Sequence, residues 1–213
     1  MSGGSSRKRP VAPTRVVLNR EYIAAMALEV IDEKGLDGFS MRKLGAALGA
    51  DPMAAYRHFA DQQDLFDGIA VVLFEELELE NLPWQADWRE MMRAYAHRLR
   101  SVLTRHPQAV SVFVTRPVRS AAAIDIGNRM IARLTASGFA PARALQLSRC
   151  LREFAIGHIL SHASDVAAAG RSRKPAADSP DYNELAAAAD AASGDYFDIG
   201  LTALFDGFDH HVG

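Results

Sequence analysis

Apolar residues recur at three- and four-residue steps through most of the chain, the spacing that places them on one face of an α-helix. In the segment 20–34 this spacing is set by Ile23, Ala27 and Ile31, and Gly35 follows as a stop signal. Alternation with a period of two, which would indicate strands, is almost absent. The pattern therefore predicts an all-α protein.

Two short helices and one long helix are predicted directly after the first. The segment 41–48 follows a capping Ser40, and the segment 52–59 follows a capping Asp51 with proline at its first position. A longer helix is predicted for 61–78. Two helices joined by a short glycine-containing turn, the second brief and amphipathic, are typical of a helix-turn-helix. Its core is expected to contain Ile23, Ala27, Val30, Met41, Leu44, Tyr56 and Phe59.

The rest of the chain is predicted to be helical as well. Prolines and glycines divide it into amphipathic segments at 87–105, 107–114, 121–136, 141–164 and 196–208. Between the last two, residues 168–180 are predicted to form a mobile loop, because they combine basic residues with Gly and Pro. A weak alanine-rich helix is predicted for 182–192.

Composition narrows the possible functions only a little. The 213 residues include 24 Lys plus Arg against 26 Asp plus Glu, so the net charge does not by itself indicate nucleic-acid binding. A single cysteine cannot form an internal disulfide, and no segment resembles an export signal. No apolar run approaches the ~20 residues that span a bilayer. We therefore expect a cytoplasmic protein without a membrane partner.

Charge is distributed unevenly at the start of the chain. Residues 1–17 contain Arg7, Lys8, Arg9 and Arg15 among Gly, Ser and Pro, and no acidic residue. This composition predicts a disordered basic arm. Two functions remain open for it, a solubilising tail or an arm that contacts DNA phosphates.

The exposed face of the segment 52–59 is short and apolar to basic, as suits a helix that enters a DNA groove. Arg57 could donate to a guanine or to a phosphate, and Met53 and Ala54 could touch a thymine methyl, although core packing is the alternative for Met53. Flanking residues could contact the DNA backbone. The residues predicted to bind DNA are Ser40, Arg42, Met53, Ala54, Tyr56, Arg57 and His58.

A pair of histidines raises an alternative function. His158 and His162 are four residues apart on a predicted helix and so share one face. With Glu153 they could form the metal site of a helical metal-dependent enzyme. No HExxH motif or cysteine pair accompanies them, so we favour a place for them in a pocket or dimer interface, and no metal or other cofactor is predicted.

The segment from residue 18 to about residue 69 resembles the DNA-binding domain of the TetR (tetracycline repressor) family. The resemblance is carried by Gly35 with Phe39 and Ser40, by Leu44 with Leu48 and Gly49, and by Tyr56, His58 and Phe59 before Asp61. It implies a homodimeric regulator, a repressor rather than an enzyme, that places the 52–59 helix in the major groove of a palindromic operator. It also implies a small-molecule effector that releases the DNA, with a helix-turn-helix domain at 18–66 and an effector-binding and dimerisation domain at 67–213.

The second part also resembles this family, in the ligand-binding domain of tetracycline repressors. The shared features are Asp87-Trp88, His106, Thr115-Arg116-Pro117, Gly138-Phe139, Ala144-Leu145 and Gly157. Those repressors hold a magnesium chelate through a histidine just before the Arg-Pro pair, where this chain has Val112 and Phe113. The expected effector is therefore apolar or amphipathic, and the last two long helices are expected to form the dimer. The residues predicted to bind it are Tyr95, Leu99, Val112, Phe113, Arg116, Phe154 and His158.

Overall fold

The computed structural model describes residues 18–116, 118, 120–169, 187–188, 191 and 194–209, with the backbone alone over 162–169. All regular structure in these residues is helical, as the pattern of apolar residues predicts. The predicted arm at 1–17 lies outside the described residues, as do the greater part of the predicted loop at 168–180 and most of the predicted helix at 182–192.

The N-terminal elements are α1 (Arg20–Lys34), α2 (Met41–Ala47), the 3₁₀ helix η1 (Pro52–Arg57) and α3 (Gln62–Glu75). Each begins after a side chain that accepts a hydrogen bond from a backbone N–H of the first turn, which satisfies a donor that has no partner within the helix. The capping residues are Asn19, Ser40, Asp51 and Asp61. These helix starts agree with the capping signals in the sequence.

The second helix of the helix-turn-helix differs from the prediction. The segment expected as a helix over 52–59 is a six-residue 3₁₀ helix, η1, packed closely on α2. Gly45 makes this approach possible, because a Cβ there would lie 2.9 Å from the backbone nitrogen of Pro52. Gly49, with φ +60°, then turns the chain between the two helices.

The first part of the core matches the predicted residues with one exception. Ile23, Ala27, Leu44 and Phe59 are each at most 1% exposed. The expectation that Tyr56 closes this core is wrong, because its side chain is 40% exposed. Ala55 and Phe59, four residues apart, occupy the inward side of η1 and of the turn after it, and Tyr56 lies on the other side.

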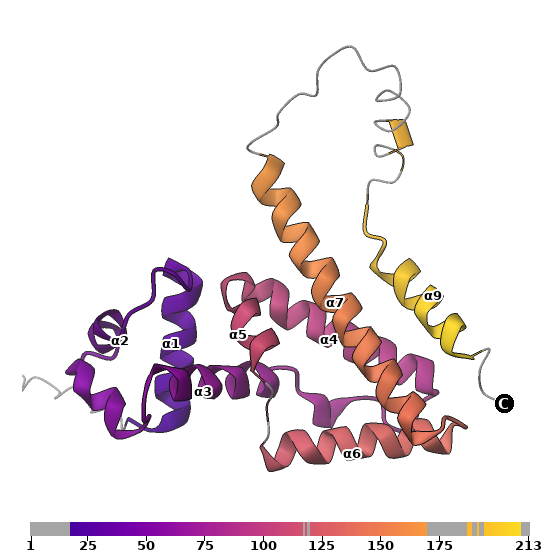
Figure 1. Ribbon diagram of the computed structural model, residues 1–213, viewed down its shortest axis with the longest axis horizontal. Helices are drawn as coiled ribbons and strands as arrows, with labels where there is room; N and C mark the ends of the chain where they lie inside the picture. The colour runs from indigo at the N-terminus through magenta and orange to yellow at the C-terminus, as the bar shows by residue number, and fades with distance from the viewer. Residues whose placement is uncertain are drawn as a thin grey trace, which may run out of the picture.

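The C-terminal elements form a helical layer around one long helix (Figure 1). They are η2 (Leu79–Asn81), α4 (Trp88–Arg105), η3 (Pro107–Ala109), α5 (Val110–Thr115), α6 (Ala121–Ala136), α7 (Pro141–Ala169) and α9 (Phe197–Asp209). Helix α7 packs on α4 and α6, and α9 packs on α7. Helix α3 leads from the α1–α2 group to α5 and crosses the predicted domain boundary at 66/67.

A row of ion pairs fastens α9 to α4. Arg89 donates to two aspartates of α9 at 2.9 Å and 2.7 Å, and Arg93 donates to Asp198 at 2.6 Å. Arg100 donates to Asp195, just before α9, at 2.6 Å. Beneath these pairs, Phe197 and Phe205 of α9 are fully buried. This attachment determines which side of α7 is covered by α9.

Candidate functional site

The first candidate surface is the outer side of η1. Met53 is 63% exposed, and Tyr56 and Arg57 are also exposed, whereas Ala54 and His58 are half-buried. The exposure of Met53 decides against core packing. Helix α2 packs against η1 and carries the exposed Arg42, and Ser40, which caps α2, accepts a hydrogen bond from the Lys43 N–H at 3.3 Å. The residues predicted to bind DNA thus lie on η1 and the start of α2.

Arg20 holds the end of η1 in place. Its guanidinium donates to the backbone carbonyl of His58 at 2.6 Å and to both carboxylate oxygens of Asp64, at 2.6 Å and 3.1 Å. It also lies 4.2 Å from the centre of the Phe59 ring. We call Arg20, Asp64 and the His58 carbonyl the Arg20 clamp. The clamp joins the start of α1, the end of η1 and the start of α3.

The charge of Asp64 is stabilised by this arrangement. The hydrogen bond from Arg20 and a second one from the Ala60 N–H, at 2.9 Å, lower the pKa of the Asp64 carboxyl from 3.8 to about 2. Asp64 is therefore ionised at neutral pH and can fix the guanidinium that holds His58. Neither Arg20 nor Asp64 was among the predicted site residues, because the contact joins residues 44 positions apart.

Lys43 is a further basic residue near η1 that the sequence analysis did not assign to DNA. It is exposed beside Arg42, and its ammonium donates to the Gly38 carbonyl at 2.5 Å. The signal was present, because the amphipathic pattern of 41–48 already directs both basic residues away from the core.

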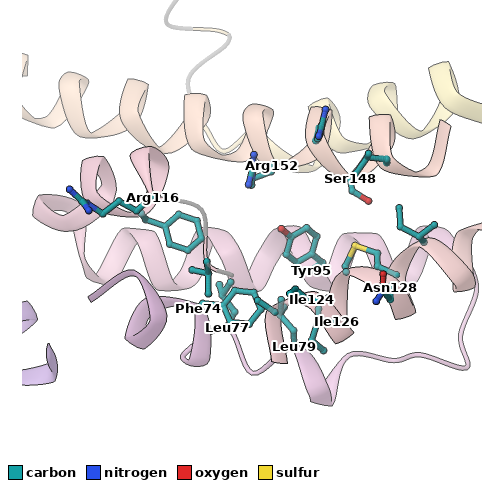
Figure 2. Close-up of a pocket in the computed structure, with 18 of the residues that line it drawn as sticks. Phe74, Leu77, Leu79, Tyr95, Arg116, Ile124, Ile126, Asn128, Ser148 and Arg152 are labelled. Atoms are coloured by element: carbon teal, nitrogen blue, oxygen red, sulfur yellow. The ribbon is translucent and has the colours of Figure 1, made fainter. Parts of the chain in front are cut away.

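The second candidate site is a cavity of about 900 Å³ between the end of α3 and helices α4 to α7. This volume is in the range of small-molecule pockets, which run to roughly 1,000 Å³. Figure 2 shows Leu77 and Leu79 on one side of Tyr95, with Ser148 and Arg152 projecting from α7 on the other. The cavity is thus largely apolar, and Ser148 and Arg152 are among its polar groups.

The predicted ligand residues divide into two groups. Tyr95, Phe113 and Arg116 line the cavity. Leu99 and Val112 are buried in the core at 0% and 3% exposure, and they are not among the cavity's lining residues.

Phe154 and His158 also lie outside the cavity wall. They pack against Phe197 of α9, with ring centroids 5.4 Å and 5.0 Å from it. The physical reason is helix geometry, because Phe154 follows the cavity residue Arg152 by two positions and so points to the opposite side of α7.

Several polar lining residues were missed by the sequence analysis. Asn128 lies on α6, and Ser148, Arg149 and Arg152 lie on α7. The α7 residues follow Leu145 at three- and four-residue steps, so a shared face was detectable. What the sequence alone did not reveal is which face of α7 turns toward α6 and which toward α9.

The proposed metal ligands are not assembled in the described part of the chain. Glu153 is exposed, whereas His158 is only 6% exposed, and the side chain of His162 lies outside the described residues. No group of three or more His, Cys, Asp or Glu residues that could hold a metal occurs among the residues described.

Polar contacts join the cavity to α3, and the far end of α3 to the first helix. Arg116 donates to the Asp67 carboxylate at 2.5 Å and to the Gln63 carbonyl at 3.0 Å, while the same residue lines the cavity. Figure 2 shows its guanidinium directed away from Tyr95. At the other end of α3, His106 lies between two carboxylates, 2.6 Å from Asp32 of α1 and 3.0 Å from Glu76.

Two family models match these two parts of the chain. "Bacterial regulatory proteins, tetR family" matches residues 23–69, and "Tetracyclin repressor-like, C-terminal domain" matches residues 82–212. The chain belongs to the TetR family. The resemblance inferred from the helix-turn-helix residues is therefore confirmed, as is the expectation of a DNA-binding, ligand-responsive regulator. TetR-family proteins are regulators and not enzymes, so the metal-enzyme alternative has no support.

Individual relatives agree with the assignment to the TetR family. An HTH-type transcriptional regulator of Saccharopolyspora erythraea is 31% identical over 148 residues, which are 68% of this chain and 61% of that protein. The class D tetracycline repressor of Escherichia coli is 29% identical over 201 residues, 90% of this chain and 89% of the repressor. A possible TetR family transcriptional regulator from Streptomyces coelicolor A3(2) superimposes with a TM-score of 0.76 at 25% identity, covering 90% and 99% of the two chains.

No helix in the described residues of this TetR-family chain combines the length and hydropathy that a bilayer-spanning segment needs.

Proposed function

We propose that this chain represses transcription by binding a palindromic operator as a homodimer, and that a small molecule in the α3–α7 cavity releases it. The observation that carries the proposal is the outer side of η1, where Met53, Tyr56 and Arg57 are exposed on a capped element held by the Arg20 clamp. A rigid, exposed element of this kind suits insertion into a major groove. Because its partner is operator DNA, we infer that the protein acts in the cytoplasm.

Arg57 is the residue we propose to read a base. It is the exposed basic residue of η1, and an arginine in the major groove can donate two hydrogen bonds to one guanine. Arg42 and Ser40, at the start of α2, are proposed to contact phosphates, and Ala54 and Met53 to touch a thymine methyl. Tyr56 and His58 complete the proposed DNA-binding surface at its edge.

Dimerisation is proposed to use the outer sides of α7 and α9. Leu160 on α7 is 47% exposed, Tyr196 just before α9 is 46% exposed, and Ile199 in the first turn of α9 is 72% exposed. Apolar side chains exposed on adjacent helices are typical of a protein–protein interface. The ion pairs between α4 and α9 support the proposal, because they hold α9 in one position on each protomer.

Coupling between the cavity and the DNA surface is proposed to run through α3. Arg116 contacts Asp67 and Gln63 on α3 and also lines the cavity. Asp64, on the same helix, belongs to the Arg20 clamp that holds η1. A ligand that displaces Arg116 would therefore bias the position of α3, and by linkage operator DNA must weaken ligand binding by the same factor.

Selection of bound sites from random duplex DNA tests the proposed function. Two identical η1 elements on a two-fold dimer should select an inverted repeat with half-sites about 10 base pairs apart, or a multiple of that spacing. Sites without dyad symmetry would refute the dimeric mode of binding. On the selected site, Arg57→Ala should relax the preference at one position in each half-site, whereas Arg42→Ala should weaken all sequences alike.

A further inference from the structure

The cavity has an apolar body and one charged side. Leu77 and Leu79 before α4, Phe113 on α5, and Ile126 and Met130 on α6 supply carbon surface. A ligand that fills this space must therefore bury a substantial apolar part. The apolar lining agrees with the expected apolar or amphipathic effector, but it does not determine the effector's charge.

Among the residues that the structure describes, the charges that line the cavity are all positive. Arg116, Arg149 and Arg152 line it, and none of these described lining residues is Asp or Glu. Arg116 is already paired with Asp67 at 2.5 Å. Its charge is therefore balanced within the protein, which leaves the two arginines of α7 to determine the electrostatic preference of the cavity.

Arg149 and Arg152 have no acidic partner in the part of the chain that the structure describes. Neither forms an ion pair there, although Glu153 follows Arg149 by four positions on the same helix. The two arginines are three positions apart, so their like charges are neighbours on one side of α7. An anion between them would relieve this repulsion and receive charge-assisted hydrogen bonds.

Neutral donors lie beside the two arginines. Burial raises the pKa of the Tyr95 hydroxyl, so Tyr95 is protonated at neutral pH and can donate a hydrogen bond. The positive charge of Arg152 acts on this hydroxyl in the opposite direction, which places Arg152 within electrostatic range of Tyr95. Figure 2 shows Arg152 and Ser148 projecting from α7 toward the level of Tyr95.

We infer that the ligand of this cavity is an amphipathic anion, whose apolar body fills the cavity and whose acidic group binds Arg149 and Arg152. The inference rests on the proposed function of the cavity as the effector site. A cation would be repelled by the two unpaired arginines, and a neutral ligand would gain nothing from them. The charged group would lie at the α7 side, beside Tyr95 and Ser148.

Two fluorescent probes with the same ring system test this charge preference. Anilinonaphthalene sulfonate carries a negative charge, and phenylnaphthylamine is the same molecule without the sulfonate. The purified chain should bind the sulfonate about tenfold more tightly than the neutral probe, the effect of one charged hydrogen bond. Arg152→Gln and Arg149→Gln should each remove most of this difference in affinity and leave the affinity for the neutral probe unchanged.

Two variants serve as controls. Glu153 is exposed and adjacent to Arg152 in the sequence, but it does not line the cavity. Glu153→Gln should therefore not weaken sulfonate binding. Ala123→Trp fills part of the cavity and should reduce the binding of both probes. Both arginines are exposed, so their substitution by glutamine should leave the thermal unfolding temperature unchanged.

Equal affinity of the two probes would overturn the inference, as would arginine variants that weaken both probes alike or a Glu153→Gln variant that weakens the sulfonate. A separate titration on the selected operator tests the proposed function. If the charge preference is present but no anionic ligand of the cavity releases operator DNA, the effector role is wrong and the charge preference stands. If ligands release DNA regardless of their charge, the effector role stands and the inference falls.

Discussion

Replacing Asp64 with Asn removes the charge that fixes the Arg20 clamp while keeping the size of the side chain. The clamp lowers the pKa of the Asp64 carboxyl from 3.8 to about 2, which corresponds to at most about 2 kcal/mol of stability at neutral pH. The Arg20 and Asp64 side chains are 45% and 31% exposed, so solvent screens part of this energy. We expect Asp64→Asn to lower the free energy of unfolding by about 1 kcal/mol.

The pH dependence of this loss follows from the direction of the pKa shift. A carboxyl whose pKa is lowered by folding stabilises the protein above its unfolded value of 3.8, and that stability disappears as the pH falls toward about 2. The difference between the parent chain and Asp64→Asn should therefore be constant above about pH 5 and should narrow below about pH 4. Urea unfolding of both proteins at a series of pH values measures this difference in the free energy of unfolding.

Operator binding provides the second measurement. Without the charge of Asp64, Arg20 is held less firmly against the His58 carbonyl, so η1 is less well ordered for binding. We expect operator affinity to fall by up to about fivefold, the equivalent of about 1 kcal/mol. Asp37→Asn is the control, because Asp37 is exposed in the same domain and its removal changes the net charge equally. If both variants behaved alike in unfolding and in DNA binding, the clamp would have no positioning role.

Two more substitutions test the packing that places η1 and joins the first helix to the second domain. Gly45→Ala would bring a Cβ to within 2.9 Å of Pro52, so it should lower the free energy of unfolding by about 1–3 kcal/mol and weaken operator binding. Gly127→Ala is the control, because its Cβ meets no atom within 4 Å and should not destabilise the protein. Thermal unfolding and DNA titration compare the two variants. His106→Gln would remove the imidazole ring that contacts the Asp32 and Glu76 carboxylates together and should cost about 1–3 kcal/mol in urea unfolding, clearly more than Arg105→Gln, which breaks one exposed ion pair.

Local signals in the sequence were sufficient to predict where the helices of the first domain begin. Ser40 and Asp51 cap as predicted, and Asn19 and Asp61 cap in the same way, because a cap depends on residues within one turn of it. Helix ends were less well predicted. Helix α3 ends at Glu75 rather than 78, and α7 continues to residue 169 rather than 164, because no single residue forces these ends.

Contacts between distant segments were not predictable in the same way. The row of ion pairs from α4 to the aspartates of α9 joins residues more than 90 positions apart, and it is these contacts that turn one side of α7 toward α9. Without these contacts, the sequence did not show which side of α7 carries Phe154. Phe154 was predicted to bind the ligand, whereas in the structure it packs on Phe197. Arg152, two positions away, lines the cavity instead.

The same geometry explains why α3 can connect two sites that the sequence shows only as separate patterns. Its first turn carries Asp64 for the Arg20 clamp, its next residues include Asp67 for the cavity residue Arg116, and Glu76 just beyond its end contacts His106. Each of these contacts involves a charge at the surface of α3, while its apolar side is buried on the core throughout. We therefore expect that the helix can shift by exchanging polar contacts at its surface, at a smaller cost than repacking its buried side, and that such a shift would move the end of η1.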